Sequence, residues 1–170
     1  MKKRLTFCLL GVAVGLTTAL SPGWSQDKEV VGWLEKVRIC PENLTIHAKL
    51  DTGARNSSLN APHANVFKRK GETWVRFDVT DRAGKTATLQ RKVHRITKIK
   101  QHGRSPDLRP VVRLSICLGD TFKVVEVNLR DPSDFNYQML IGRSFLKEDF
   151  LVDASIKFTK RPKCRGARLP

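Results

Sequence analysis

The segment Ile46-His47-Ala48-Lys49-Leu50-Asp51-Thr52-Gly53-Ala54 constrains the fold of this chain more than any other stretch. Ile46, Ala48 and Leu50 alternate with polar residues, which predicts a β-strand with one buried face. The strand pattern stops at an acid, a hydroxyl and a glycine, and glycine permits a sharp turn or a close backbone approach. A carboxylate placed at the end of a buried strand is held by a rigid element and can face a cleft. Asp51 is therefore the first candidate for a catalytic group.

The remainder of the chain is typical of an all-β protein. Alternating apolar and polar residues predict strands, and clusters of Pro, Gly, Asp and Asn between them predict turns. Residues 144–150 predict one or two helical turns, with Phe145 and Leu146 facing the core. Many short strands with one late helix indicate a barrel or a sandwich. The predicted strands cover residues 30–39, 45–50, 59–61, 73–80, 86–93, 111–118, 122–129, 137–143, 151–153 and 156–158, and residues 131–134 form a predicted turn.

Three further expectations concern less regular parts of the chain. Residues 95–108 are basic, with Gly103, Ser105 and Pro106 at their centre, and predict a flexible excursion between strands. The basic, proline-bounded tail 160–170 is expected to be frayed. Trp33 and Trp74 are expected in the core.

The N-terminus is typical of a secretory signal peptide. Basic residues precede the uncharged run 5–20, and small residues lie near a plausible cleavage site after Ser25. An uncleaved anchor is the alternative, although the run is short for a bilayer span, which needs about 20 residues. We therefore expect a signal peptide at 1–25, a domain at 30–159, a basic tail at 160–170, and export to the periplasm.

The charge of the chain is strongly positive. Removing the signal peptide takes away Lys2, Lys3 and Arg4 and no acid, so the formal net charge falls from +16 to +13. Such an excess suits nucleic acid in the cytosol, but export makes nucleic acid an unfavoured partner. An anionic envelope polymer or an acidic protein would fit outside the cytoplasm, and a solvated basic surface with no dedicated partner is the simpler alternative.

Three cysteines follow the signal peptide: Cys40, Cys117 and Cys164. An oxidising compartment permits one disulfide and leaves one thiol over. Their spacing does not say which two would pair, and all three could equally be small buried apolar residues.

Several segments together resemble one bacterial family. Ala48-Lys49-Leu50-Asp51-Thr52-Gly53-Ala54-Arg55, Trp74-Val75-Arg76-Phe77, Met139-Leu140-Ile141-Gly142-Arg143 and Leu151-Val152-Asp153-Ala154-Ser155 follow one another in the family's order. They resemble the bacterial retropepsin-like aspartic endopeptidases, a family also labelled ATP-dependent zinc proteases and associated in some members with RimK-type glutamate ligases. The resemblance spans residues 31–158.

The resemblance implies a fold, an activity and a set of site residues. It implies a closed all-β barrel of the acid-protease type with one short C-terminal helix, and hydrolysis of peptide bonds. It gives catalytic roles to Asp51, Thr52 and Gly53. The residues that would support the site or the substrate are Ala54, Arg55, Ile141, Gly142 and Arg143.

Two facing carboxylates that share one proton suit this chemistry. One can activate a water while the other protonates the peptide carbonyl, because two close like charges do not both ionise, as is known for aspartic proteases in general. This chain contains a single Asp-Thr-Gly. Asp153 is the other acid that ends an apolar strand, but it lacks the glycine turn. We therefore expect a two-fold homodimer in which each copy contributes Asp51.

No cofactor is expected. Where the family usually has a histidine, this chain has Asn60, and an amide does not replace an imidazole as a zinc ligand. The histidines His47, His63, His94 and His102 have no metal-ligand spacing, and the chain has no phosphate-binding loop.

Two other functions remain open. A catalytically silent module could use the same cleft and basic surface to hold a peptide or an envelope polymer. A hydrolase of glutamyl-type amide bonds is the other alternative, because an acidic substrate would suit the positive charge.

Overall fold

The computed structural model describes residues 27–101, 104–130 and 137–164. Their secondary structure is almost entirely β, with one short helix. The elements are β1 Glu29–Cys40, β2 Leu44–Leu50, β3 Ser57–Asn60, β4 Asn65–Arg69, β5 Glu72–Thr80, β6 Thr86–Lys92, β7 Arg95–Gln101, β8 Arg104–Leu118, β9 Thr121–Arg130, β10 Met139–Ile141, α1 Arg143–Leu146 and β11 Phe150–Lys157.

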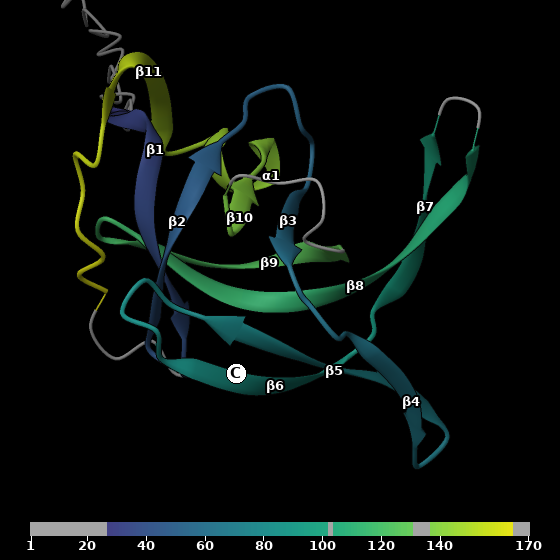
Figure 1. The fold of residues 1–170 in the computed structure, drawn as a ribbon. Coiled ribbons are helices and arrows are strands. Elements are labelled where there is room, and N and C mark those ends of the chain that lie inside the picture. The colour runs from purple at the N-terminus through teal and green to yellow at the C-terminus, as the bar shows by residue number, and fades with distance from the viewer. Residues whose placement is uncertain (1–26, 102–103, 131–136, 165–170) are drawn as a thin grey trace, which may run out of the picture.

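Six strands close into a barrel (Figure 1). Neighbouring strands pair in the order β1-β2-β10-β3-β9-β8, and a further antiparallel pairing of β1 with β8 joins the two ends of this series. Strands β11 and β7 extend the sheet beyond β1 and β8. Burial follows the alternation of the sequence: in β2 every second residue, from Leu44 to Leu50, is buried. The expected all-β, retropepsin-like closed barrel with one short helix is confirmed.

A second sheet of three strands, β4-β5-β6, packs against the barrel. Its inner face contributes Val75, Phe77, Val79 and Leu89 to the common core, each at most 3% exposed. Strand β4 was not predicted. Trp74 lies on the opposite face of β5 and is only half-buried, so the expectation that it belongs to the core is wrong.

Trp33 also lies outside the core. It is half-buried on β1 and packs edge-on against Tyr137, with ring centroids 5.9 Å apart. Trp74 shares its face of β5 with Arg76 and Asp78, so its ring is shielded by neighbours without entering the core.

The basic segment 95–108 is not an irregular excursion. It forms the β7–β8 hairpin, in which Arg95 pairs with Val111 and Thr97 pairs with Arg109. Ile96 and Ile99 are three residues apart and lie on opposite faces of β7, so the segment lacks the regular alternation that predicts a strand. Figure 1 shows the hairpin projecting beyond the barrel.

The end of the chain is also more ordered than expected. The two short strands predicted around 151–158 are one strand, β11, which runs parallel to β1 with an irregularity in the register between Gly32 and Leu34. The fraying expected of the tail is wrong for residues 160–164, which cross β1 and reach the β8–β9 turn.

Several contacts fasten this last segment. Cys117 and Cys164 form a disulfide, which leaves Cys40 as a buried free thiol. The backbone N–H of Lys163 donates to the carbonyl of Gly119 at 2.7 Å, and the Arg38 guanidinium donates to the carbonyl of Cys164 at 2.7 Å.

Buried Glu35 anchors the same segment from inside. Its Oε1 accepts hydrogen bonds from the N–H of Gly32 and from the N–H and hydroxyl of Thr159, and its Oε2 accepts from the N–H of Lys160. A fully buried carboxylate with four donors is well satisfied. It therefore acts as a structural clamp between β1 and the end of the chain.

Three predictions concern other parts of the chain. The signal peptide at 1–25, the turn at 131–134 and the end of the tail at 165–170 lie outside the described residues. In the segments that are described, we find no helix long and apolar enough to cross a membrane.

Candidate active site

Parallel pairing of β2 with β10 places Asp51 at the centre of the candidate site. Ile141 of β10 lies opposite Leu50, and the backbone N–H of Asp51 donates to the carbonyl of Ile141 at 2.8 Å. Strand β10 is buried along its whole length, between β2 and β3. The catalytic candidate therefore begins its turn from a strand fixed on both sides.

The carboxylate of Asp51 is oriented by its own turn. Its Oδ1 accepts hydrogen bonds from the N–H groups of Gly53 at 2.9 Å and Ala54 at 3.2 Å. A Cβ on residue 53 would lie 3.1 Å from this same oxygen, so glycine provides the clearance that the carboxylate needs. The side chain of Asp51 is half-buried and forms no ion pair with any described residue. This geometry fixes one oxygen and leaves the second available for chemistry.

The junction of β10 and α1 supports the turn from the other side. Arg143 donates from Nη1 to the carbonyls of both Thr52 and Gly53, each at 2.8 Å. The N–H of Arg143 donates to the carbonyl of Ala54, and a Cβ on residue 142 would lie 2.6 Å from the carbonyl oxygen of Asn56. The two segments are thus packed backbone against backbone.

The fold brings together all the site residues predicted from the sequence. Arg143 neither pairs with an acid nor serves as a simple surface charge, since it binds the carbonyls of the turn. Thr52 is exposed, and its hydroxyl makes no hydrogen bond to a described residue. Asp153 lies elsewhere and accepts from the N–H and hydroxyl of Ser155.

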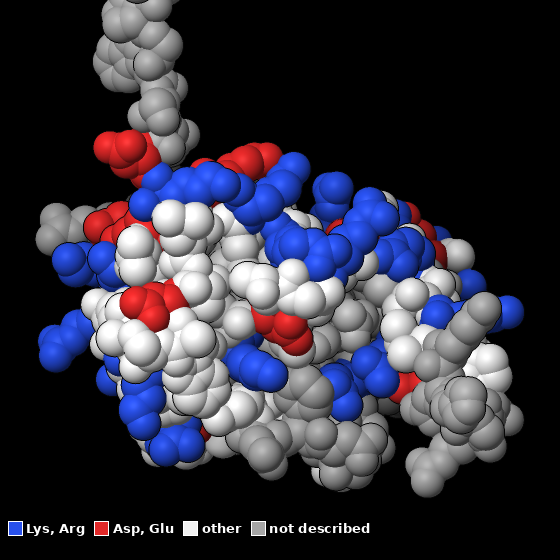
Figure 2. Space-filling model, turned by 90° about the horizontal axis from the view of Figure 1, so that it is seen from above, with Lys and Arg blue, Asp and Glu red and all other residues white. Residues whose placement is uncertain are grey.

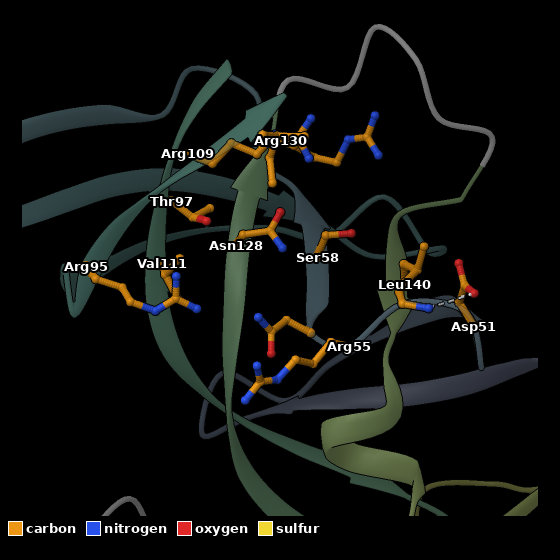
Figure 3. A pocket seen from close by; sticks show the side chains of 13 residues that line it. Asp51, Arg55, Ser58, Arg95, Thr97, Arg109, Val111, Asn128, Arg130 and Leu140 are labelled. Atoms are coloured by element: carbon orange, nitrogen blue, oxygen red, sulfur yellow. Dashed lines mark hydrogen bonds between the residues drawn. The ribbon is translucent and has the colours of Figure 1, made fainter. Parts of the chain in front are cut away.

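A cavity of about 460 Å³ adjoins Asp51 (Figure 3). Its walls come from the catalytic turn, β3, β9, β10 and the β7–β8 hairpin. Apolar side chains and an unusual number of guanidinium groups face it. The lining residues are Asp51, Ala54, Arg55, Asn56, Ser58, Arg95, Thr97, Ile99, Arg109, Val111, Asn128, Arg130 and Leu140.

Four of these residues are arginines, whereas Asp51 is the one acid among them. Arg55 is exposed, and none of the ion pairs found among the described residues involves it. Arg109 pairs with Asp107 at 2.5 Å. Lys and Arg also cover more area than Asp and Glu on the face of the molecule seen from above in Figure 2. The cavity is therefore suited to a negatively charged ligand.

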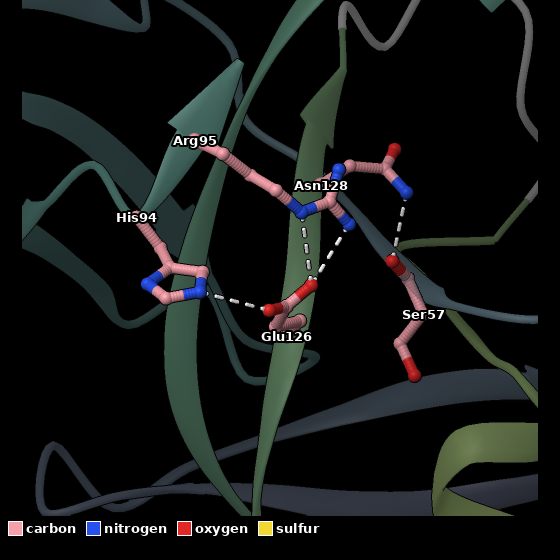
Figure 4. A network of polar contacts seen from close by, with 5 residues as sticks. All are labelled: Ser57, His94, Arg95, Glu126 and Asn128. Carbon is pink, nitrogen blue, oxygen red and sulfur yellow. Dashed lines mark hydrogen bonds and ion pairs between the residues drawn. The ribbon is translucent and has the colours of Figure 1, made fainter. Parts of the chain in front are cut away.

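Arg95 is held in place from the outer side of the cavity (Figure 4). Its Nη2 and Nε donate to Glu126 Oε2 at 2.8 and 3.2 Å, and His94 Nε2 lies 3.1 Å from Oε1 of the same carboxylate. The hydrogen bond from Arg95 is the main reason that the pKa of Glu126 is lowered, with further contributions from the charges of Arg95, His94 and Arg113. Glu126 therefore remains an anion that orients Arg95.

The sequence interpretation missed most of this wall. Arg95, Thr97, Arg109 and Val111 all line the cavity because they form two opposed pairs of the hairpin. Their period-two spacing was a usable signal, since alternate residues of a strand share one face. Asn128 and Arg130 have the same spacing on β9, whereas nothing in the sequence indicates that β9 lies beside β3.

The residues present do not fit a zinc ion. Within the described parts of the chain, no three His, Cys, Asp or Glu side chains gather in a way that could hold a metal. Asn60, which stands where the family usually has histidine, donates from Nδ2 to the carbonyl of Tyr137. Its amide therefore has a structural partner.

Comparison with known proteins gives an independent assignment. The family model described as RimB-like, retropepsin-like aspartic endopeptidase RimB, matches residues 30–163. A solved structure of the protein Lpg0085 from Legionella pneumophila, described as having unknown function, has 33% sequence identity and a TM-score of 0.66. That similarity covers 79% of this chain and 100% of the other.

Longer curated proteins also match. Proteins named probable alpha-L-glutamate ligase from Shewanella pealeana and Desulfotalea psychrophila are 34% and 29% identical over 116 and 115 residues. Each match covers 66% of this chain but 25% of the relative, so the chain spans about a quarter of their length. The family match over residues 30–163, with the Asp51 turn and its supporting strand inside it, shows that this chain belongs to the RimB-like family of retropepsin-like aspartic endopeptidases.

Proposed function

We propose that this protein hydrolyses peptide bonds as an aspartic endopeptidase, with Asp51 contributed by each copy of a two-fold homodimer. The observation that carries the proposal is the geometry of Asp51. One carboxylate oxygen is fixed by two backbone N–H groups, the other has no partner among the described residues, and a cavity large enough for several side chains lies beside it.

The reaction follows from two such carboxylates sharing one proton. The ionised Asp51 accepts a proton from a water as the water oxygen attacks the peptide carbonyl carbon. The protonated Asp51 donates its proton to the carbonyl oxygen, which gives a neutral tetrahedral diol. Transfer of a proton to the amide nitrogen then breaks the C–N bond and releases a carboxylic acid and an amine.

A second copy is needed because the cavity of one copy offers too few carboxylates for the reaction. Asp51 is the one acid among the residues lining the cavity, and one carboxylate cannot be both base and acid in the same step. Thr52 and Gly53 are exposed at the tip of the turn, where a second copy related by a two-fold axis could approach. We propose this approach as the event that completes the site.

The test combines activity with oligomeric state. Digestion of a peptide library from pH 3 to pH 8 should show cleavage by the wild type and none by Asp51→Asn, while Asp153→Asn, a matched change outside the site, keeps full activity. Light scattering should show a dimer at the concentrations used. Equal cleavage by Asp51→Asn, or full activity in a strict monomer, would contradict the mechanism.

A second feature concerns the substrate. Arg55 lines the cavity and forms no ion pair with a described residue. It favours peptides rich in carboxylates over neutral ones, because a guanidinium group binds a carboxylate with paired hydrogen bonds. The relatives named probable alpha-L-glutamate ligase are consistent with glutamyl peptides as one such class. We therefore propose that the favoured substrates carry Glu or Asp beside the scissile bond.

Matched peptide pairs test this preference. Replacing Glu by Gln on either side of the cleaved bond should lower kcat/KM of the wild type at least tenfold. The same replacement should matter much less in Arg55→Gln. Arg161→Gln, which changes an exposed arginine outside the cavity, serves as the control for net charge. An unchanged kcat/KM of the wild type after the Glu-to-Gln change would refute the substrate preference but not the peptidase mechanism.

We also propose that the protein works in an oxidising compartment, the periplasm for a cell with two membranes. The Cys117–Cys164 disulfide supports this location, because such bonds persist mainly outside the reducing cytosol. Fractionation of cells that produce the full chain would test it, and recovery with reduced cysteines in the cytosol would count against it.

A further inference from the structure

The outer face of the three-stranded sheet is a second candidate for a binding surface. The strands of this sheet do not belong to the six-stranded barrel. Its inner face packs into the core, so only its outer face is open to a ligand. On the outer face two rows cross all three strands: Asn65, Arg76 and Gln90 in one row, and Phe67, Trp74 and Lys92 in the other. The pair Arg69 and Glu72 lies beside the second row, and the pair Asp78 and Thr88 lies beside the first. We refer to the six residues of the two rows as the outer sheet face.

The side chains of this face combine cations, amides and aromatic rings. Arg76, Gln90, Lys92 and Asn65 are exposed, whereas Phe67 and Trp74 are half-buried between them. Opposed residues on neighbouring strands lie about 5 Å apart and successive residues on one face of a strand about 7 Å apart. The six side chains therefore form a flat patch roughly 10 Å across.

Charge on and around the patch is positive. Residues 65–92 contain eight Lys or Arg and three Asp or Glu. Lys92 pairs with Glu72 at 2.5 Å, but both side chains remain about half exposed, so a stronger anionic ligand can compete for Lys92. Arg76 has no ion pair with any described residue.

Trp74 supplies a supported ring at the centre of the patch. The guanidinium of Arg69 lies 5.2 Å from the centre of its ring, within the range of a cation–π contact. A partly exposed ring beside exposed cations and amides suits an acidic sugar chain. The C–H groups of a sugar pack on an aromatic surface, the sugar hydroxyls bind amides, and acidic sugar groups pair with Arg and Lys.

We propose that the outer sheet face binds an anionic polysaccharide, and so holds the enzyme on an acidic glycan while the Asp51 cavity stays open to peptides. Nucleic acid could also use aromatic rings and cations. The disulfide indicates a compartment outside the reducing cytosol, and so favours a glycan over nucleic acid as the ligand. This proposal does not depend on catalysis.

Binding to immobilised alginate, a polymer of acidic sugars, tests the proposal. Neutral dextran and oligothymidylate serve as comparison ligands, and all proteins carry Asp51→Asn so that no cleavage can occur. We expect alginate to bind, dextran not to bind, and the double variant Arg76→Ser/Lys92→Ser to weaken the affinity for alginate at least tenfold.

Two further variants separate binding by the outer sheet face from attraction by the net charge of the protein. Trp74→Leu should weaken alginate binding at least threefold, with its fold checked by circular dichroism. The double variant Arg113→Ser/Lys147→Ser, a matched charge change at exposed positions outside the patch, should stay within twofold of the parent protein. Equal losses in both double variants, or equal binding of dextran, would refute the surface. Stronger binding of oligothymidylate that is lost in the same variants would make the ligand a nucleic acid and overturn the glycan.

Discussion

The turn that carries Asp51 depends on one side chain that is not part of it. Arg143 binds two successive carbonyls of the turn, at Thr52 and Gly53, and so fixes the peptide planes next to Asp51. Hydrogen bonds from charged donors contribute about 1.5–3 kcal/mol when shielded from water, and less here because Arg143 is exposed. Its main effect should therefore be on the position of the turn.

Arg143→Met should separate the effect of Arg143 on the position of the turn from its effect on the stability of the fold. We expect kcat to fall by between about tenfold and a hundredfold, because small displacements of a catalytic group cost that much. Thermal unfolding should shift by only a few degrees. Arg143→Lys, which keeps the charge but loses the forked geometry, should recover part of kcat. Equal activity in Met and Lys variants would show that Arg143 does not position the turn.

Individual residues were the best predicted part of the site. Asp51, Gly53 and Gly142 could be placed from the sequence because strand periodicity and glycine each imply a local geometry. The role of Arg143 could not, since its partners are carbonyls of a segment 90 residues earlier.

At the scale of elements, the β7–β8 hairpin contributes most to the character of the cavity. Its pairing was missed because Gly103, Ser105 and Pro106 at the centre of the segment predicted a flexible excursion, and because Ile96 and Ile99 do not share one face of a strand. The three-stranded sheet was only partly foreseen, since exposed β4 lacks an apolar face. The closed order of the barrel is fixed by pairings between distant strands, which local patterns do not encode.

The ion pair of Arg95 with Glu126 should make the hairpin sensitive to acid. The pKa of Glu126 is lowered by the hydrogen bond from Arg95, so the folded protein holds its charge to a lower pH than the unfolded chain does. The stabilisation is fully present above the unfolded pKa of about 4.5 and is lost as the pH falls through the lower folded value.

Glu126→Gln measures this contribution. The variant should be less stable to urea than the wild type by about 1 kcal/mol at pH 7, as is usual for a partly exposed pair. The difference should shrink as the pH is lowered below about 4.5. Asp120→Asn, at an exposed position, should show no such trend. A difference that is constant with pH would mean that the ion pair is not its cause.

For the molecule as a whole, the end of the chain is part of the domain. The disulfide between Cys117 and Cys164 closes a loop of 47 residues in sequence, and Glu35 binds the same segment from within the barrel. Loops of this size restrict the unfolded chain enough to stabilise a fold by about 4 kcal/mol in the entropic model.

The double variant Cys117→Ser/Cys164→Ser should therefore be less stable by about 2–4 kcal/mol in denaturant unfolding. Treatment of the wild type with a reductant should give a similar loss. Cys40→Ser, which removes the thiol outside the bridge, is expected to respond to the reductant as the wild type does. An unchanged midpoint after verified reduction would show that the loop is already restricted by its other contacts.

The support of Asp51 by residues 141–144 also has a consequence for how the protein is made. Chains grow from the N-terminus, so the catalytic turn leaves the ribosome long before β10 and Arg143, which bind its backbone. A growing or truncated chain thus carries the acid without the strand that fixes it. Synthesis itself therefore delays the assembly of this turn until residues 139–143 have been made.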